Sequence, residues 1–316
     1  MVDLKLDYGK DFLEEEVRCD YTIDSEMKRI WAVELDLVNE LKRVCDKYGI
    51  QYFADGGTLL GAIRHKGFIP WDNDIDLCMF RDQYEKLCEV APREFKHPYF
   101  FQTEYTDPTS LRGHAQLRNS ETTGAIRIEL NKTARLNQGI FIDIFPLDGV
   151  PEDPATMEQH IDDVVSNLRT AKKLASMTDG VLLGNARFRP LRMLARPIAG
   201  KIIKKFRNYD DYYRKYEEEC KKYDPRATEK VAKYFPIPFV RNWVWNREDF
   251  DEAVEVPFEM ITLPVPKGYE NVLNTCFGKN WRTPLRVDTM HGTMLFDVDR
   301  SYSEYMKEVN KGGLFR

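Results

Sequence analysis

Apolar residues recur at intervals of three and four between residues 25 and 48, which is the spacing of one face of an α-helix. The positions are Ile30, Val33, Leu37, Leu41, Val44 and Tyr48. Gly49 follows directly, and glycine is common just after the last turn of a helix. The pattern predicts an amphipathic helix from Ser25 to Tyr48. The charged, aperiodic residues 1–24 before it are expected to form an extended lead-in.

The rest of the chain alternates between strand-like and helix-like patterns. Short apolar runs bounded by turn residues predict strands over 99–103, 115–118, 125–130 and 139–145. Helical spacing predicts helices over 82–95, 155–177 and 209–223, the first of them kinked or ended by Pro92. Further on, the sequence predicts a hairpin over 254–264 and a helix from Pro266 to Phe277, whereas the last stretch, with His291 and Asp297, stays unassigned.

Residues 51–80, QYFADGGTLLGAIRHKGFIPWDNDIDLCMF, hold the densest concentration of candidate chemistry. A short strand over 51–54 and a helix over 59–65 are expected, with Asp55-Gly56-Gly57-Thr58 between them. Two adjacent glycines allow a ligand to approach the backbone closely. Thr58 is a plausible N-cap, and the N–H groups at such a helix start favour an anion such as phosphate.

Asp74 and Asp76 directly precede an apolar run. If residues 74–80 form a strand, the two carboxylates share one face. Mg²⁺ is typically held by one or two carboxylates together with substrate phosphates and water. An EF-hand loop starting at Asp72 is excluded, because its sixth and twelfth positions would be Leu77 and Gln83 instead of Gly and Glu. The pattern therefore predicts a metal site at Asp74 and Asp76.

A third acid, Asp143, lies inside the apolar run Ile140–Ile144, where an unpaired carboxylate would be costly. The alternative of a purely structural aspartate, which caps a turn at the end of a strand, fits Asp148 better than Asp143. Arg112, His114 and Arg118 belong to the same strand-rich region. Each of them could face either phosphate or solvent.

The run Asp55–Gly61 and the run Arg64–Asp76 together closely resemble the LicD family, which is named for bacterial phosphocholine transferases and is related to fukutin and fukutin-related protein. Further matching residues are Asp143–Asp148 and the spaced set Pro266, Tyr269, Leu273, Phe277, Gly278, Trp281 and Pro284. The resemblance implies an α/β (α+β) fold with a nucleotidyltransferase-like core and a mixed sheet. The core would comprise residues 25–150 and 249–316, with a mainly helical insertion over 151–248.

The same resemblance implies metal-dependent transfer of phosphocholine from CDP-choline to a hydroxyl of a glycan, such as a teichoic acid or lipopolysaccharide precursor, with release of CMP. Asp74 and Asp76 would hold Mg²⁺ or Mn²⁺, and Asp143 would complete the metal site or accept the proton of the acceptor hydroxyl. The expected substrate-binding residues are Asp55, Gly56, Gly57, Thr58, Arg64, His65, Trp71, Asp72 and Arg118.

Three alternatives stay open. The donor could carry ribitol, glycerol or ethanolamine phosphate, or the protein could transfer the nucleotide itself, because the motif does not distinguish these outcomes. A non-catalytic module that binds a CDP-ligand or a glycan is the third. The complete set of three acids argues against it, since a dead homologue has no physical need for converging carboxylates.

Composition argues against several other classes of protein. A net charge of −5 argues against a general nucleic-acid binder. The six cysteines show no paired spacing typical of zinc sites and are expected to be free thiols. The N-terminus lacks the apolar core of a signal peptide, and no apolar run approaches the ~20 residues that span a bilayer. We therefore expect a cytoplasmic protein.

Two features would suit particular partners. Residues 187–207 contain eight basic and no acidic residues, interleaved with apolar ones, so this segment could lie on an anionic membrane surface at the inner face of the membrane. A solvated helix face is the alternative, and Pro190 and Pro197 interrupt any single helix. A choline headgroup would need aromatic faces, for which the candidates are Trp71, Trp243, Trp245 and Trp281. Trp243 and Trp245 could equally be strand residues that pack into the apolar core.

Overall fold

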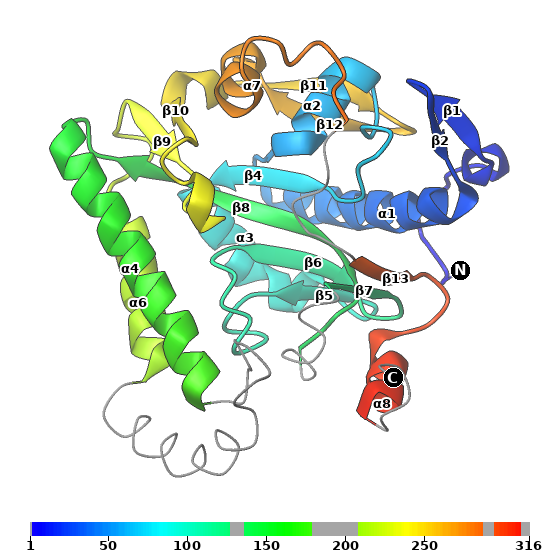
Figure 1. Ribbon diagram of the computed structural model, residues 1–316, viewed down its shortest axis with the longest axis horizontal. Helices are drawn as coiled ribbons and strands as arrows, with labels where there is room; N and C mark the ends of the chain where they lie inside the picture. Colours follow the sequence, from blue (N-terminus) through cyan, green and yellow to red (C-terminus); the bar gives the residue numbers. More distant parts are fainter. Residues whose placement is uncertain (1, 127–135, 179–207, 287–293, 311–316) are drawn as a thin grey trace.

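The computed structural model of the 316-residue chain describes residues 2–126, 136–178, 208–286 and 294–310 (Figure 1). The basic segment 187–207, His291 and residues 127–130 of one expected strand lie outside these ranges. What the sequence predicts for them stays a prediction.

A seven-stranded mixed sheet forms the centre of the described part of the chain. Its strands are β3 (Phe53–Ala54), β4 (Asp76–Phe80), β5 (Tyr99–Gln102), β6 (Ala115–Asn119), β8 (Ile140–Val150), β9 (Lys230–Ala232) and β10 (Val244–Asn246). Strand β8 pairs in parallel with β4 along one edge, and along the other edge it pairs antiparallel with β6 and then with β9. All 11 residues of β8 are buried, as expected of a central strand covered on both faces. The predicted mixed α/β class is confirmed.

Two helices pack against the sheet and lie behind it in Figure 1. They are α1 (Ser25–Tyr48) and α3 (Arg81–Glu94). The predicted bounds of α1 are confirmed: Asp24 accepts a hydrogen bond from the Met27 amide at 2.8 Å, and Gly49 ends the helix with a φ of 60°. Pro92 lies in the last turn of α3, where little helix remains for it to interrupt.

Helix α2 (Gly56–His65) packs on β4 beside three C-terminal elements. These are the hairpin of β11 (Ala253–Phe258) and β12 (Ile261–Pro266), and helix α7 (Tyr269–Phe277). They share one large apolar core with α1, α3 and the central strands. Residues from both ends of the sequence therefore support the loop that precedes α2.

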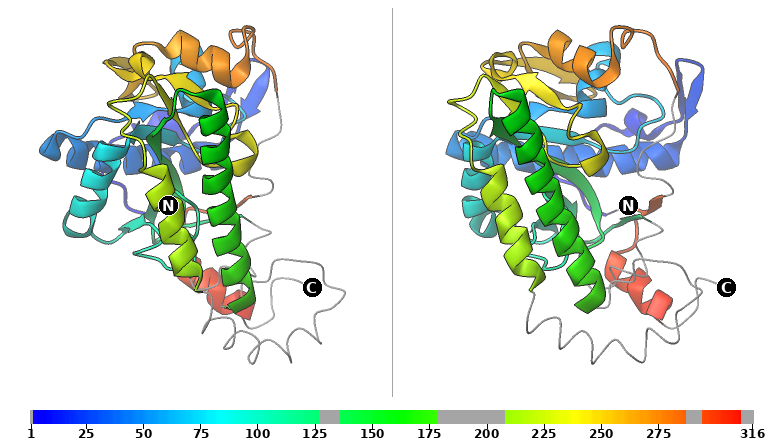
Figure 2. Two further views of the ribbon diagram at one scale, coloured as in Figure 1. Left: turned by 90° about the vertical axis from the view of Figure 1, so that its left-hand side faces the viewer. Right: turned by 60° about the vertical axis from the view of Figure 1, so that its left-hand side comes forward.

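The region 151–248 contributes helices and strands. Helices α4 (Pro154–Thr178) and α6 (Tyr209–Cys220) lie side by side at one end of the sheet and bury a second apolar core (Figures 1 and 2). Strands β9 and β10 follow and extend the central sheet from β8. The predicted helical insertion thus also carries two strands of the sheet.

The remaining elements are short. They are η1 (Lys10–Leu13), β1 (Glu16–Arg18), β2 (Tyr21–Ile23), β7 (Thr123–Ile126), η3 (Ile237–Phe239), η4 (Arg247–Phe250), β13 (Met294–Asp297) and α8 (Tyr302–Asn310). Strands β1 and β2 form a hairpin in the expected lead-in, and β13 pairs with β7. Within the described ranges, no helix combines the length and the apolar character needed to cross a membrane.

Three local predictions are wrong. Helix α2 begins at Gly56, so Thr58 is not its N-cap; the Thr58 hydroxyl accepts a hydrogen bond from the Asp76 amide at 2.8 Å instead. Pro266 ends β12, where its missing N–H costs no ladder bond, and α7 begins later, at Tyr269. Asp148 lies inside β8 and not at a turn, and the buried guanidinium of Arg81 compensates its carboxylate with two hydrogen bonds of 2.6 Å.

Candidate functional site

The predicted acids converge at the junction of β4 and β8. The parallel register places Asp76, the first residue of β4, opposite Asp143 of β8, and Asp72 and Asp74 lie in the segment that leads into β4. Asp72, Asp74 and Asp76 are half-buried, whereas Asp143 is 4% exposed. Burial and then the negative charge of Asp74 raise the pKa values of Asp72 and Asp76 well above their usual range. The site is therefore a concentration of mutually repelling carboxylates.

The glycine pair lies against this cluster. Gly56, the first residue of α2, has a φ of 50°, and a Cβ added to it would lie 3.1 Å from Asp76 Oδ2. A Cβ on Gly57 would lie 2.6 Å from Asp72 Oδ2, closer than real Cβ contacts allow. The amide of Asp55, just before α2, donates to the Asp76 carbonyl at 2.9 Å. A Cβ at either position would therefore press on a carboxylate of the cluster, and glycine lets the start of α2 approach the carboxylates without displacing them.

Asp143 is held in place by neighbouring side chains. Its Oδ1 accepts hydrogen bonds from His114 Nε2 at 3.0 Å and from Gln116 Nε2 at 2.5 Å. Arg118 in turn donates to Gln116, to Gln102 Oε1 at 2.6 Å and to the Gly139 carbonyl at 2.7 Å. With 1% of its surface exposed, Arg118 orients Gln116 from behind the site. Its predicted contact with substrate does not fit this position.

His114 is buried between Phe145 and Phe235, with ring centroids at 4.4 and 5.0 Å. Burial lowers the pKa of His114 below its usual value, despite the opposing effect of Asp143. A neutral imidazole whose Nε2–H donates to Asp143 is the form that fits. His114 thus contacts a predicted catalytic acid directly.

Lys233 is a site residue that the sequence reasoning missed. It follows β9 directly, is 3% exposed, and its ammonium donates to Asp55 Oδ2 just before the glycine pair. The ammonium also lies over the rings of Phe145 and Trp243, 4.2 and 4.3 Å from their centroids. The negative charges of Asp55 and Asp76 outweigh burial and raise the pKa of Lys233, so it stays charged. The available signal in the sequence was a lysine inside the otherwise apolar run 231–235, VAKYF.

Arg64 and His65 are not brought to the carboxylates. They lie in the last turn of α2, eight and nine residues after Gly56, which is about 12 Å along a helix. Arg64 donates to the Trp281 carbonyl at 2.7 Å and to His65 Nε2 at 2.8 Å. Burial and the charge of Arg64 lower the pKa of His65 to about 4. These residues tie α2 to the segment after α7, and the structure does not support their predicted contact with phosphate.

The four candidate tryptophans differ in what surrounds them. Trp245 and Trp281 are buried, 3% and 4% exposed, and belong to the main core. The Trp243 ring stacks on Phe239 and already carries the ammonium of Lys233. Trp71 is half-buried, next in sequence to Asp72, and meets Tyr21 edge-on at 6.0 Å. It remains the candidate best placed to offer a ring to a ligand.

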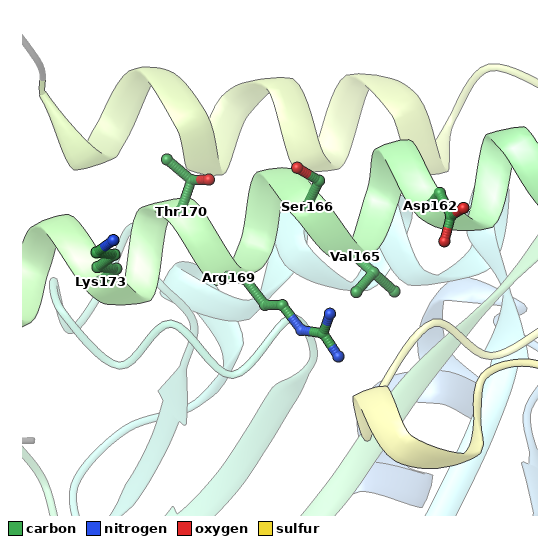
Figure 3. A pocket seen from close by; sticks show the side chains of 6 residues that line it. All are labelled: Asp162, Val165, Ser166, Arg169, Thr170 and Lys173. Atoms are coloured by element: carbon green, nitrogen blue, oxygen red, sulfur yellow. The ribbon is translucent and has the colours of Figure 1, made fainter.

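A hollow of about 340 Å³ lies elsewhere, along helix α4 (Figure 3). The side chains that line it are Asp162, Val165, Ser166, Arg169, Thr170 and Lys173. In Figure 3 the Arg169 side chain extends away from α6. Because a single helix supplies the lining and none of the predicted catalytic residues contributes, we do not assign this hollow to the chemistry.

The chemistry of the donor set suits a hard divalent cation. Among the residues that the structure describes, no group of three or more His, Cys, Asp or Glu side chains is placed so that it could hold a metal ion as it stands. The carboxylate oxygens gathered beside the start of α2 are nevertheless the ligand type that Mg²⁺ and Mn²⁺ prefer. Asp72 and Asp76, with their raised pKa values, would be relieved of repulsion by such an ion. Asp74, Asp76 and Asp143 are the residues that would hold it.

Comparison with known proteins agrees with this geometry. Residues 49–174 match the family model described as LicD/FKTN/FKRP, nucleotidyltransferase domain. The lipopolysaccharide cholinephosphotransferase LicD of Haemophilus influenzae is 26% identical over 260 residues, covering 80% of this chain and 91% of that protein. The human ribitol 5-phosphate transferase FKRP is 49% identical over 37 residues, 12% of this chain and 8% of FKRP.

The matched range 49–174 contains the glycine pair, the Asp74–Asp76 pair and Asp143, and so includes all the predicted catalytic residues. Lys233 lies outside that range but inside the same sheet through β9. Residues 49–174 therefore match the nucleotidyltransferase domain of the LicD/FKTN/FKRP family, and most of the chain is similar to a LicD protein.

Proposed function

We propose that this chain is a metal-dependent transferase that moves phosphocholine from CDP-choline to a hydroxyl group of a cell-surface glycan precursor and releases CMP. One observation carries the proposal: Asp76 and Asp143 meet across β4 and β8 beside the glycine pair of α2. Its support comes from similarity along 91% of a lipopolysaccharide cholinephosphotransferase. The glycan could be a lipopolysaccharide or teichoic acid precursor, and a lipid-linked one would bring the enzyme to a membrane surface.

The residues have separate tasks in this scheme. Gly56 and Gly57 let a phosphate oxygen of the donor approach the first N–H groups of α2, whose dipole favours negative charge. Asp74 and Asp76 would hold Mg²⁺ or Mn²⁺. When bound, such a cation would supply positive charge to offset the charge that develops on the departing CMP phosphate. Asp55 and Lys233 brace the turn that presents the glycines.

Asp143 had two possible roles, metal ligand or general base. Its Oδ1 already accepts two hydrogen bonds, and hydrogen bonds to the ionised form lower the basicity of a carboxylate. The same bonds fix the side chain in one orientation, as partners of metal ligands commonly do. We therefore favour the ligand role for Asp143.

A CDP-polyol is the second candidate donor class. The observation in its favour is the 37-residue match to a protein named as a ribitol 5-phosphate transferase. Because that match covers 8% of FKRP, it supports the shared chemistry of the motif more than the choice of headgroup.

A donor screen tests the proposal. CDP-choline, CDP-ethanolamine, CDP-ribitol and CDP-glycerol are each incubated with the protein and Mg²⁺, and CMP release is followed by chromatography. We expect slow hydrolysis that is fastest with CDP-choline, stops on chelation of the metal and is absent in Asp76→Asn. Metal-independent release, or no release and no binding with any of the four donors, would contradict the proposal.

A further inference from the structure

Helix α1 carries a glutamate that points to a further part of the site. Trp31 on α1 donates its indole N–H to the Asp72 carbonyl at 3.0 Å, so this face of the helix lies against the segment that leads into β4. Glu34 follows three residues later, on the same face. It is 1% exposed, and its Oε2 is buried with no hydrogen-bond partner among the described residues.

The other buried acids of α1 are all compensated. Asp36 accepts hydrogen bonds from the amides of Lys5 and Leu6, both at 2.8 Å, and from the Tyr99 hydroxyl at 2.7 Å. Glu40 pairs with the ammonium of Lys5 at 3.1 Å and with Arg43 at 2.9 Å. The orphaned oxygen of Glu34 is therefore not a general property of acids on this helix.

The charges around Glu34 are those of the candidate metal site. Burial raises the pKa of Glu34 well above its usual value. The negative charges of nearby acids raise it further, in the order Asp74, Asp72, Asp76 and Asp143. A buried carboxylate without a partner is costly, and four neighbouring acids increase that cost. A cation bound among these acids would compensate all of them together.

We infer that Glu34 is a further carboxylate of the cation site, facing the metal from helix α1 either directly or through one water molecule. The inference rests on the proposed function, because it assumes that a divalent cation binds at Asp74 and Asp76. It adds a helix outside the matched domain to the site and explains why an acid occupies the apolar face of α1 beside Trp31. The alternative is an inert, permanently protonated side chain.

Calorimetric titration with Mn²⁺ alone distinguishes a carboxylate of the cation site from an inert, protonated side chain. Wild type, Glu34→Gln and Glu40→Gln are titrated, the last as a matched control because it is also a buried glutamate of α1. We expect Glu34→Gln to bind Mn²⁺ about 10–100-fold more weakly, since partners of metal ligands contribute effects of that size. Glu40→Gln should keep the wild-type affinity.

An affinity of Glu34→Gln within twofold of wild type would overturn the inference and leave the proposed function standing. Absence of Mn²⁺ binding by the wild type would overturn both. Thermal unfolding gives a second readout: without metal, Glu34→Gln should be at least as stable as wild type, because one repelling acid is gone, and Mn²⁺ should raise its midpoint less. If Glu34→Gln does not fold, Glu34→Met, of similar size, is titrated in its place, and the same comparison decides.

Discussion

At the scale of single residues, two buried carboxylates of the described chain are each compensated by a specific basic partner. Asp148 is paired with Arg81, and Asp55 with Lys233. The half-buried acids Asp72, Asp74 and Asp76 repel one another instead. Unfavourable charge tends to concentrate where function requires it. Substitution of a repelling acid should therefore reduce turnover, whereas substitution in a buried ion pair should reduce the stability of the fold.

Replacing Asp76 by Asn should abolish transfer without unfolding the protein. The change removes one negative charge from a site where acids repel one another, so cooperative unfolding should persist while turnover at saturating Mg²⁺ falls about 100-fold or more. Asp82→Asn, at an exposed acid of α3, serves as the control and should be fully active. Near-normal turnover of Asp76→Asn at saturating Mg²⁺ would refute the metal assignment.

Lys233→Met should destabilise the fold, because it leaves the Asp55 carboxylate buried and unpaired. Breaking a buried ion pair costs about 3–5 kcal/mol, measured here by denaturant unfolding. The double variant Lys233→Met with Asp55→Asn should recover part of that loss, since neither partner then carries an uncompensated charge. Lys267→Met, which removes an exposed pair with Glu252, should show no comparable change. Additive losses in the double variant would argue against a coupled pair.

Trp71→Leu tests which ring receives the donor headgroup. If the Trp71 ring contacts the trimethylammonium of choline, its loss removes about 0.5–2 kcal/mol of cation–π attraction. The KM for CDP-choline should then rise more than the KM for CDP-ribitol, which has no cationic headgroup. Steady-state kinetics with both donors provides the measurement. An equal effect on both KM values would assign Trp71 a purely structural role.

At the scale of elements, the start of α2 is the part that brings the glycine backbone against the carboxylates. The sequence motif identified the glycine pair but placed the helix start three residues late, because it assigned the N-cap to Thr58 although Asp55, an equally suitable residue type, precedes the glycines. The structure shows what decides the start: Thr58 is engaged with the Asp76 amide, and Gly56 takes up a positive φ that favours glycine.

Gly56→Ala tests the close approach at the start of α2, and Gly49→Ala is its matched control. Both positions have a positive φ, 50° and 60°, so both alanines should cost about 1–2 kcal/mol of stability. A Cβ at Gly49 meets no atom within 4 Å, whereas one at Gly56 lies 3.1 Å from Asp76 Oδ2. Turnover should therefore fall sharply in Gly56→Ala only. Equal activity of the two variants would show that the close approach at α2 is not needed.

At the scale of the whole molecule, the site is assembled from distant parts of the chain. The motif with Asp74 and Asp76 and the apolar run around Asp143 could be predicted because both are local patterns of residue type. The buried ion pair of Asp55 with Lys233, 178 residues later, could not, because it depends on β9 pairing with β8. The burial of Arg118 could not be predicted for the same reason, because it depends on the pairing of β6 with β8.

The fate of a doubly labelled donor tests the central claim most directly. CDP-choline labelled in both the choline and the cytidine is incubated with the protein, Mg²⁺ and a glycan acceptor, and the labels in the isolated acceptor are counted. Phosphocholine transfer predicts choline label in the acceptor and cytidine label in free CMP, with both signals absent for Asp76→Asn. Cytidine label in the acceptor would contradict the account and identify a true nucleotidyltransferase.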